Sequence, residues 1–142
     1  MFIVIVGAGR VGSAVARSAL AAGHEVSVLD EDPLSDERLS AGQSRSWEEM
    51  DGQFTLGTAL EIDVLIQAGI ERADVFIAST DGDNTNLIIA QIAQRRFGVP
   101  KVLVRVMDPA RAAWYEEQGL HTISPTRHAI EMFESALAAE PA

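Results

Sequence analysis

One segment constrains this chain more than any other: residues 7–12 read Gly-Ala-Gly-Arg-Val-Gly and directly follow an apolar run at residues 2–6. Gly7 lets the chain turn sharply out of a strand, and Gly9 lets the backbone approach a phosphate without a Cβ in the way. Gly12 lets the following helix pack closely on that strand. A GxGxxG turn between a strand and a helix is typical of a dinucleotide-binding βαβ unit.

An acidic residue at the expected interval supports this interpretation. Asp30 closes the next apolar run, where a carboxylate can accept hydrogen bonds from the ribose hydroxyls of an adenosine. The N-terminus of the first helix would offer free N–H groups to the phosphates. Glu31 and Asp32 follow Asp30, and three clustered carboxylates repel a 2′-phosphate. The segment therefore favours NAD(H) or a simple adenine nucleotide over NADP(H).

Apolar runs of strand length recur along the chain, with helical patterns between them. They occupy residues 2–6, 25–29, 53–56, 75–78, 102–106 and 121–123. Three of the runs are continuously apolar, which is typical of parallel strands covered on both faces. The alternation predicts a doubly wound α/β fold with a parallel six-stranded sheet in the order 3-2-1-4-5-6. We expect a single domain at residues 1–135 and a frayed tail at residues 136–142.

Local signals place several further elements. Asp83 is the expected N-cap of a well-buried helix whose apolar residues run from Leu87 to Phe97. A last helix is expected after Pro125, and because it lies beyond the sixth strand we expect it to pack on a second subunit. Residues 33–52 are polar, and form either an adaptable loop beside the adenosine site or an ordinary surface connection, with Trp47 as an anchor.

Composition excludes several classes of function. The 142 residues include no cysteine, which excludes disulfides, thiolate catalysis and cysteine-ligated metal. A formal net charge of -10 argues against nucleic acid or an anionic membrane surface as a direct partner. Because no apolar run reaches the ~18 to 20 residues of a membrane span, we expect a cytoplasmic protein without direct membrane insertion.

Polar residues follow the third and fourth predicted strands, at the sheet edge where parallel α/β folds bind ligands. Gly57, Thr58 and Ala59 are small enough to lie against an adenine ring, or they only form a turn and a helix cap. Ser79 and Thr80 open a loop rich in hydroxyls and acids. That loop binds ribose, phosphate or a divalent cation, or it only caps the next helix; we assign no metal ligands.

Two arginines are candidate phosphate ligands. Arg10 could clamp a terminal phosphate, or it is a solvated residue on the first helical turn. Arg105 stands in the fifth apolar run, where a buried unpaired guanidinium would be costly, so it needs an anion. A ligand phosphate or a structural acid would serve, and its place near the strand end favours the ligand. The sequence shows no catalytic constellation, so we predict a protein that is not an enzyme.

Five segments together give the chain a resemblance to a known family. These are the glycine segment, Asp30-Glu31-Asp32-Pro33, Gln67-Ala68-Gly69-Ile70-Glu71-Arg72-Ala73-Asp74, Ser79-Thr80-Asp81-Gly82-Asp83-Asn84-Thr85-Asn86-Leu87 and Val104-Arg105-Val106-Met107-Asp108-Pro109. Over residues 1–130 the chain resembles the nucleotide-binding regulatory domain of Trk/Ktr potassium-uptake systems, the N-terminal domain of the RCK/KTN family.

The resemblance implies a cytoplasmic switch that lies at the inner face of the membrane through its partner. Such a subunit forms homodimers or rings on a potassium transporter or channel and changes shape with bound NAD, NADH, ADP or ATP. This chain either pairs with a second regulatory subunit or is an excised or minimal regulator. The alternative is an NAD-dependent oxidoreductase half whose substrate wall comes from another chain. The candidate nucleotide contacts are Gly7, Ala8, Gly9, Arg10, Val11, Gly12, Asp30, Glu31, Gly57, Thr58, Ala59, Ser79, Thr80 and Arg105.

Overall fold

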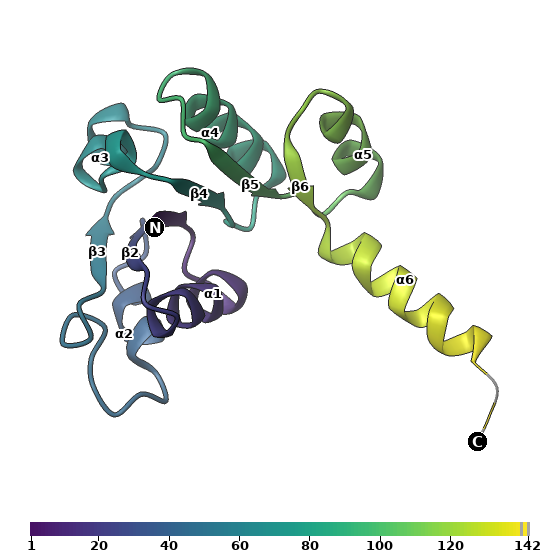
Figure 1. Cartoon of the computed structure of the whole chain (residues 1–142), viewed down its shortest axis with the longest axis horizontal. Helices are drawn as coiled ribbons and strands as arrows, with labels where there is room; N and C mark the ends of the chain where they lie inside the picture. Colours follow the sequence, from purple (N-terminus) through teal and green to yellow (C-terminus); the bar gives the residue numbers. More distant parts are fainter. Residues whose placement is uncertain (140, 142) are drawn as a thin grey trace.

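Six parallel strands form one sheet in the order β3-β2-β1-β4-β5-β6 (Figure 1). The computed structural model describes residues 1–139 and 141. The strands are β1 (Phe2–Val6), β2 (Glu25–Asp30), β3 (Gln53–Leu56), β4 (Val75–Ala78), β5 (Lys101–Arg105) and β6 (His121–Ile123). The predicted parallel sheet and its strand order are confirmed.

Helices connect successive strands on both faces of the sheet, and a further helix, α6, follows β6. They are α1 (Arg10–Ala21), α2 (Ser35–Ser40), α3 (Ile62–Gln67), the 3-10 helix η1 (Ile70–Arg72), α4 (Asp83–Arg95), α5 (Pro109–Glu117) and α6 (Pro125–Ala138). Helices α1 and α2 lie on one face, and α3, α4 and α5 lie on the other (Figure 1). Because right-handed crossovers change face where strand order reverses, the sheet is doubly wound about the β1/β4 boundary.

Each face of the sheet has its own apolar core, because neighbouring side chains on a strand point to opposite faces. Ile3 and Ile5 of β1 pack with residues of α1 and α2. Val4 and Val6 pack with residues of α3, α4 and α5. All five residues of β1 are buried, as its continuous apolar run predicts. This double burial holds the glycine segment rigidly at the end of β1.

The polar stretch at residues 33–52 is a connection fixed by one tryptophan. Trp47 is fully buried among residues of the α1/α2 layer. Its indole N–H donates to the Gln53 carbonyl at 3.0 Å, and its backbone N–H donates to Ser40 Oγ at 2.9 Å. The predicted anchoring role of Trp47 is therefore confirmed, and it holds α2 against the sheet.

The start of α4 differs from the prediction. Asp83 is the first helical residue, and the N-cap position belongs to Gly82. The Asp83 carboxylate instead accepts hydrogen bonds from the N–H groups of Met107 and Asp108, at 2.8 and 3.2 Å. The N-cap prediction was wrong because the chain after β5 brings these two donors to the carboxylate. The helix is also less buried than expected, since Ile88 points to solvent and is 49 % exposed.

The last helix extends away from the sheet (Figure 1), and none of its residues is buried. Its first turn is nevertheless fixed, because Ser124 Oγ accepts the Arg127 N–H at 3.2 Å. Arg127 also forms an ion pair with Glu116 of α5, with 2.7 Å between Nη2 and Oε1. The Arg127 guanidinium, and after it the Thr122 hydroxyl, lower the pKa of Glu116 to about 2. The pair is therefore charged at neutral pH and orients α6.

Helix α6 continues to Ala138, past the predicted domain boundary at residue 135. The boundary and the frayed tail stay predictions, and residues 140 and 142 of that tail lie outside the described residues.

Candidate functional site

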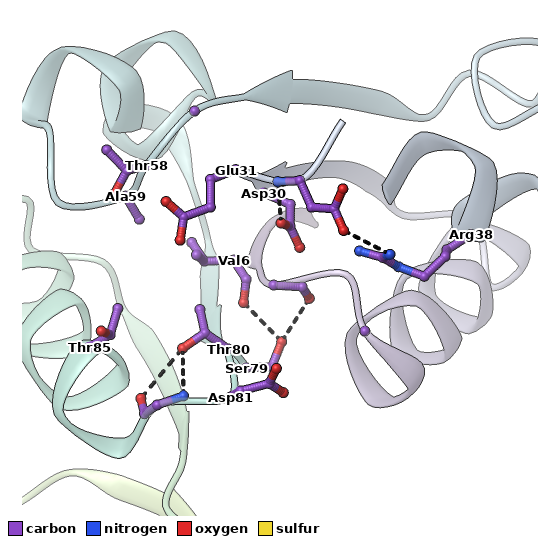
Figure 2. A pocket seen from close by; sticks show the side chains of 15 residues that line it. Val6, Asp30, Glu31, Arg38, Thr58, Ala59, Ser79, Thr80, Asp81 and Thr85 are labelled. Atoms are coloured by element: carbon purple, nitrogen blue, oxygen red, sulfur yellow. Dashed lines mark hydrogen bonds and ion pairs between the residues drawn. The ribbon is translucent and has the colours of Figure 1, made fainter. Parts of the chain in front are cut away.

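A cavity of about 370 Å³ lies at the carboxyl ends of the central strands, where strand order reverses between β1 and β4. This is the position at which open α/β sheets bind ligands, and the volume is in the range of small-molecule pockets, roughly 300–1,000 Å³. Figure 2 shows the side chains around it, which come from five separate stretches of the chain. The lining residues are Val6, Gly7, Gly9, Asp30, Glu31, Asp32, Arg38, Gly57, Thr58, Ala59, Ser79, Thr80, Asp81, Gly82 and Thr85.

Two glycines are required by the close approach of β1, β4 and α1. Gly7 has φ +98°, and a Cβ there would lie 2.6 Å from the Ser79 carbonyl oxygen. A Cβ on Gly12 would lie 1.8 Å from the Gly7 carbonyl oxygen. A Cβ on Gly9 would instead meet open space. Because Gly9 caps α1 without a side-chain hydrogen bond, the first N–H groups of that helix stay available to an anion.

The Asp30 carboxylate is fixed against the glycine turn. Its Oδ2 accepts the Ala8 N–H at 2.7 Å, and its Oδ1 accepts the Asp32 N–H at 2.9 Å. A carboxylate has about four acceptor sites, so each oxygen keeps one for another donor. Asp30 can therefore accept ligand hydroxyls from a position already set by the backbone.

The loop after β4 is held in place by a buried amide. Asn86 is fully buried, and its Nδ2 donates to the carbonyl oxygens of Thr80 and Arg105, each at 3.0 Å. Its Oδ1 accepts from the Thr80 N–H at 2.9 Å and from the Thr80 hydroxyl at 2.6 Å. The Ser79 hydroxyl lies within hydrogen-bond distance of the carbonyl oxygens of Val6, 3.0 Å, and Gly7, 3.1 Å. The Asn86 bonds hold the shape of the loop, and the two Ser79 contacts, drawn in Figure 2, fix it against the glycine turn.

The structure brings nine of the fourteen sequence-predicted contacts together in the cavity lining. Five predicted contacts do not line the cavity. Ala8 is linked to it by the bond from its N–H to Asp30, and Gly12 packs against the Gly7 carbonyl. Arg10 and Val11 are exposed on the first turn of α1.

Arg105 is a half-buried cation with an incomplete set of partners. Its side chain is 22 % exposed, its Nε has no hydrogen-bond partner among residues 1–139 and 141, and its Nη1 lies 3.9 Å from Oδ1 of the fully exposed Asp81. Such a weak, solvated ion pair leaves the guanidinium able to bind another anion.

Six lining residues are not among the predicted contacts, namely Val6, Asp32, Arg38, Asp81, Gly82 and Thr85. Arg38 comes from α2 and points at Asp32, with 3.1 Å between Nη1 and Oδ2 (Figure 2). First the Leu34 N–H and then the Arg38 guanidinium lower the pKa of Asp32. One sequence signal could have identified Arg38: it is the single cation among the five acidic residues of segment 30–38.

Two further observations concern the described residues 1–139 and 141. Within them, acidic and histidine side chains do not gather in groups of three that could hold a metal ion. No helix there combines the length and apolar character that a membrane crossing requires.

Comparison with protein families gives a match to one model. Residues 3–125 match the model of the TrkA-N domain. The chain is 42 % identical over 127 residues to the Trk system potassium uptake protein TrkA of Streptomyces coelicolor. That alignment covers 89 % of this chain and 54 % of the relative, so the chain spans about half the length of that relative.

Solved structures share the fold at low sequence identity. The TrkA-N domain of the inner membrane protein ybaL from Escherichia coli has a TM-score of 0.80 and 19 % identity, covering 96 % of both chains. The GsuK channel bound to NAD has a TM-score of 0.74 and 20 % identity, covering 96 % of this chain and 23 % of that one.

Proposed function

Because the chain belongs to the TrkA-N domain family, we propose that it is a cytoplasmic regulatory subunit of a potassium-uptake transporter or channel. It binds NAD(H), or alternatively ADP and ATP, and controls transport through a nucleotide-dependent conformational change. The observation that carries the proposal is the cavity in which the glycine turn, Asp30 and the loop after β4 converge at the switch point of the sheet.

Each part of an adenine nucleotide has a matching group in or beside this cavity. The free acceptor sites of Asp30 suit the ribose hydroxyls, and Thr58 and Ala59 lie where a flat ring can rest. The open N-terminus of α1 suits the phosphates. Arg105, with its unpartnered Nε, is the cation that we assign to a terminal phosphate, together with Arg10 on the first turn of α1.

The cavity joins segments that belong to both halves of the sheet. The turn after β1 and the end of β2 form one wall, and the loop after β4 forms the other. A nucleotide that contacts both walls favours the arrangement in which they lie closest. Since a ligand shifts a conformational equilibrium only by its differential affinity for the two states, NAD+, NADH, ADP and ATP must bind those states unequally to act as signals.

Titration calorimetry with NAD+, NADH, ADP and ATP tests the binding step. We expect the wild-type protein to bind at least one of them, and Asp30→Ala to weaken that binding roughly 10- to 100-fold. This range corresponds to the roughly 1.5–3 kcal/mol of a hydrogen bond to a charged group. A wild-type protein that binds none of the four nucleotides would refute the proposal.

Asp74→Ala is the matched control for the loss of a carboxylate. Asp74 Oδ2 accepts the Phe2 N–H at 2.7 Å, the same contact that Asp30 makes with Ala8, but at the opposite end of β1. Both variants remove one carboxylate and its bond to a backbone N–H near an end of β1, and Asp30→Ala also removes the bond from the Asp32 N–H. Only Asp30→Ala should weaken nucleotide binding, and an equal loss in both variants would point to a general folding defect.

We also propose that α6 joins two copies of this chain, as the sequence predicts. Ile130, Phe133 and Leu137 form one stripe along the helix, and Phe133 and Leu137 are 73 and 84 % exposed. Burying such side chains stabilises a contact by roughly 1.5–3 kcal/mol each. A second copy, with the same stripe, offers an equally apolar surface.

Phe133→Glu is expected to convert a dimeric protein into a monomer in sedimentation experiments, because it places a charge in the proposed contact. Met132→Glu is the control, since Met132 is 62 % exposed but lies outside the stripe, about 100° around the helix from Phe133, and the substitution should leave the mass unchanged. Equal masses for wild type and Phe133→Glu would contradict the role of the stripe.

A further inference from the structure

Arg38 reaches the candidate nucleotide cavity from a segment that is separate from the glycine turn. It stands in α2 and donates from Nε to the Ala8 carbonyl at 2.9 Å. Its Nη2 donates to Ser35 Oγ at 2.6 Å, and its Nη1 donates to Asp32 Oδ2 at 3.1 Å. Ala8 is therefore held at both ends of its backbone, by Asp30 at the N–H and by Arg38 at the carbonyl.

Asp32 is the partner that occupies the outer side of this guanidinium. Its Oδ1 accepts the Leu34 N–H at 2.9 Å while its Oδ2 binds Arg38. Both side chains stay accessible, at 40 % for Arg38 and 44 % for Asp32. Of the five N–H bonds of the guanidinium, three are used, so two donors of Arg38 have no hydrogen-bond partner within the part of the chain that the structure describes.

These charges lie where the hydroxyls of an adenosine ribose are expected. Asp30 is the assigned ribose ligand, and Asp32 follows it at two residues and bonds to it through the backbone N–H. A ribose with a free 2′-hydroxyl can donate to this carboxylate-rich wall. A 2′-phosphate cannot donate when ionised, and it meets Asp30, Glu31 and Asp32 against the single cation Arg38.

We propose that the Asp32–Arg38 pair is the specificity determinant at the ribose: Asp32 occupies Arg38, and the site therefore selects adenine nucleotides with a free 2′-hydroxyl over those with a 2′-phosphate. An arginine near the ribose is the group that accepts a 2′-phosphate in other dinucleotide sites. Here that arginine is present, but the neighbouring carboxylate compensates its charge and takes one of its donors. This inference rests on the proposed nucleotide-binding function.

The test compares ligand pairs that differ only in the 2′-phosphate. Binding of NAD+ and NADP+ is measured by calorimetry, and binding of AMP and adenosine 2′,5′-bisphosphate provides a pair without nicotinamide. Wild type should prefer the member of each pair without the 2′-phosphate. Asp32→Asn keeps the acceptor for the Leu34 N–H, removes one negative charge and frees Nη1 of Arg38. We expect it to shift the ratio of the two dissociation constants toward the phosphorylated ligand by about tenfold or more.

Two further variants test whether the shift in the ratio of dissociation constants comes from the freed Arg38 or only from the loss of one negative charge. Glu31→Gln removes one negative charge from the same cavity lining without touching the partners of Arg38, and should shift the ratio less. Asp32→Asn combined with Arg38→Gln should return the ratio toward that of wild type. An unchanged ratio in Asp32→Asn, or a gain that persists without Arg38, would overturn the inference while leaving the proposed function standing. A wild type that binds no nucleotide at all would overturn both.

Discussion

Gly12→Ala is expected to destabilise the protein by about 3 kcal/mol, the upper part of the range for overpacked positions, and to abolish nucleotide binding. The new Cβ would lie 1.8 Å from the Gly7 carbonyl oxygen and 2.9 Å from its carbonyl carbon. Both atoms are backbone, so no side chain can rotate away, and α1 has to move off the end of β1. That movement displaces the turn on which the phosphate site depends. Denaturant unfolding and calorimetric titration measure the two losses.

Gly9→Ala is the control within the same motif. Gly9 has φ -74°, which other residues adopt readily, and a Cβ there has no heavy atom within 4 Å. Its stability should stay within about 0.5 kcal/mol of wild type, as for surface substitutions. Because Gly9 lines the cavity, its added methyl group is expected to weaken nucleotide binding alone. If Gly12→Ala unfolds at the same denaturant concentration as wild type, the described close packing of α1 on β1 is contradicted.

The sheet could be predicted because its signals are local and repeated. Strands β1 and β4 are apolar throughout, and every other strand except the short β6 has at least two apolar residues. The glycine turn fixes where the first crossover begins. Right-handed crossovers then leave few strand orders, of which the observed one is typical for a GxGxxG unit. Trp47 was predictable for a similar reason, since a large apolar side chain in a polar stretch is most stable when buried.

The site was predictable only where its residues follow a strand directly. Asp30, Gly57 and Thr80 reach the cavity because the carboxyl ends of parallel strands meet at one edge of the sheet. Thr85 and Arg38 reach it from helices, and their direction depends on how each helix is rotated against the sheet. The direction of Asp83 likewise depends on two N–H groups more than twenty residues away. Tertiary packing sets these orientations, and no short sequence pattern encodes them.

Trp47→Ala is expected to lower the free energy of unfolding by about 3–5 kcal/mol, the usual cost of removing a buried aromatic side chain. Trp47 is fully buried, and its indole ring packs so closely on Gly52 that a Cβ there would lie 2.2 Å from Cε2. The variant loses this packing and leaves the Gln53 carbonyl without its indole donor. Chemical denaturation followed by circular dichroism measures the change.

Trp114→Ala is the control that tests whether the loss of stability comes from burial of the tryptophan or from removal of any aromatic side chain. Trp114 lies on α5 with 55 % of its surface exposed, so its loss should cost less than about 1 kcal/mol. The chain has two tryptophans, so each variant keeps one indole as a fluorescent reporter. Trp47 reports on the α1/α2 side of the sheet, and Trp114 reports on α5. Equal losses in the two variants would contradict the anchoring role of Trp47. A loss confined to Trp47→Ala would also predict weaker nucleotide binding, because the segment it anchors includes α2, which carries Arg38 to the cavity wall.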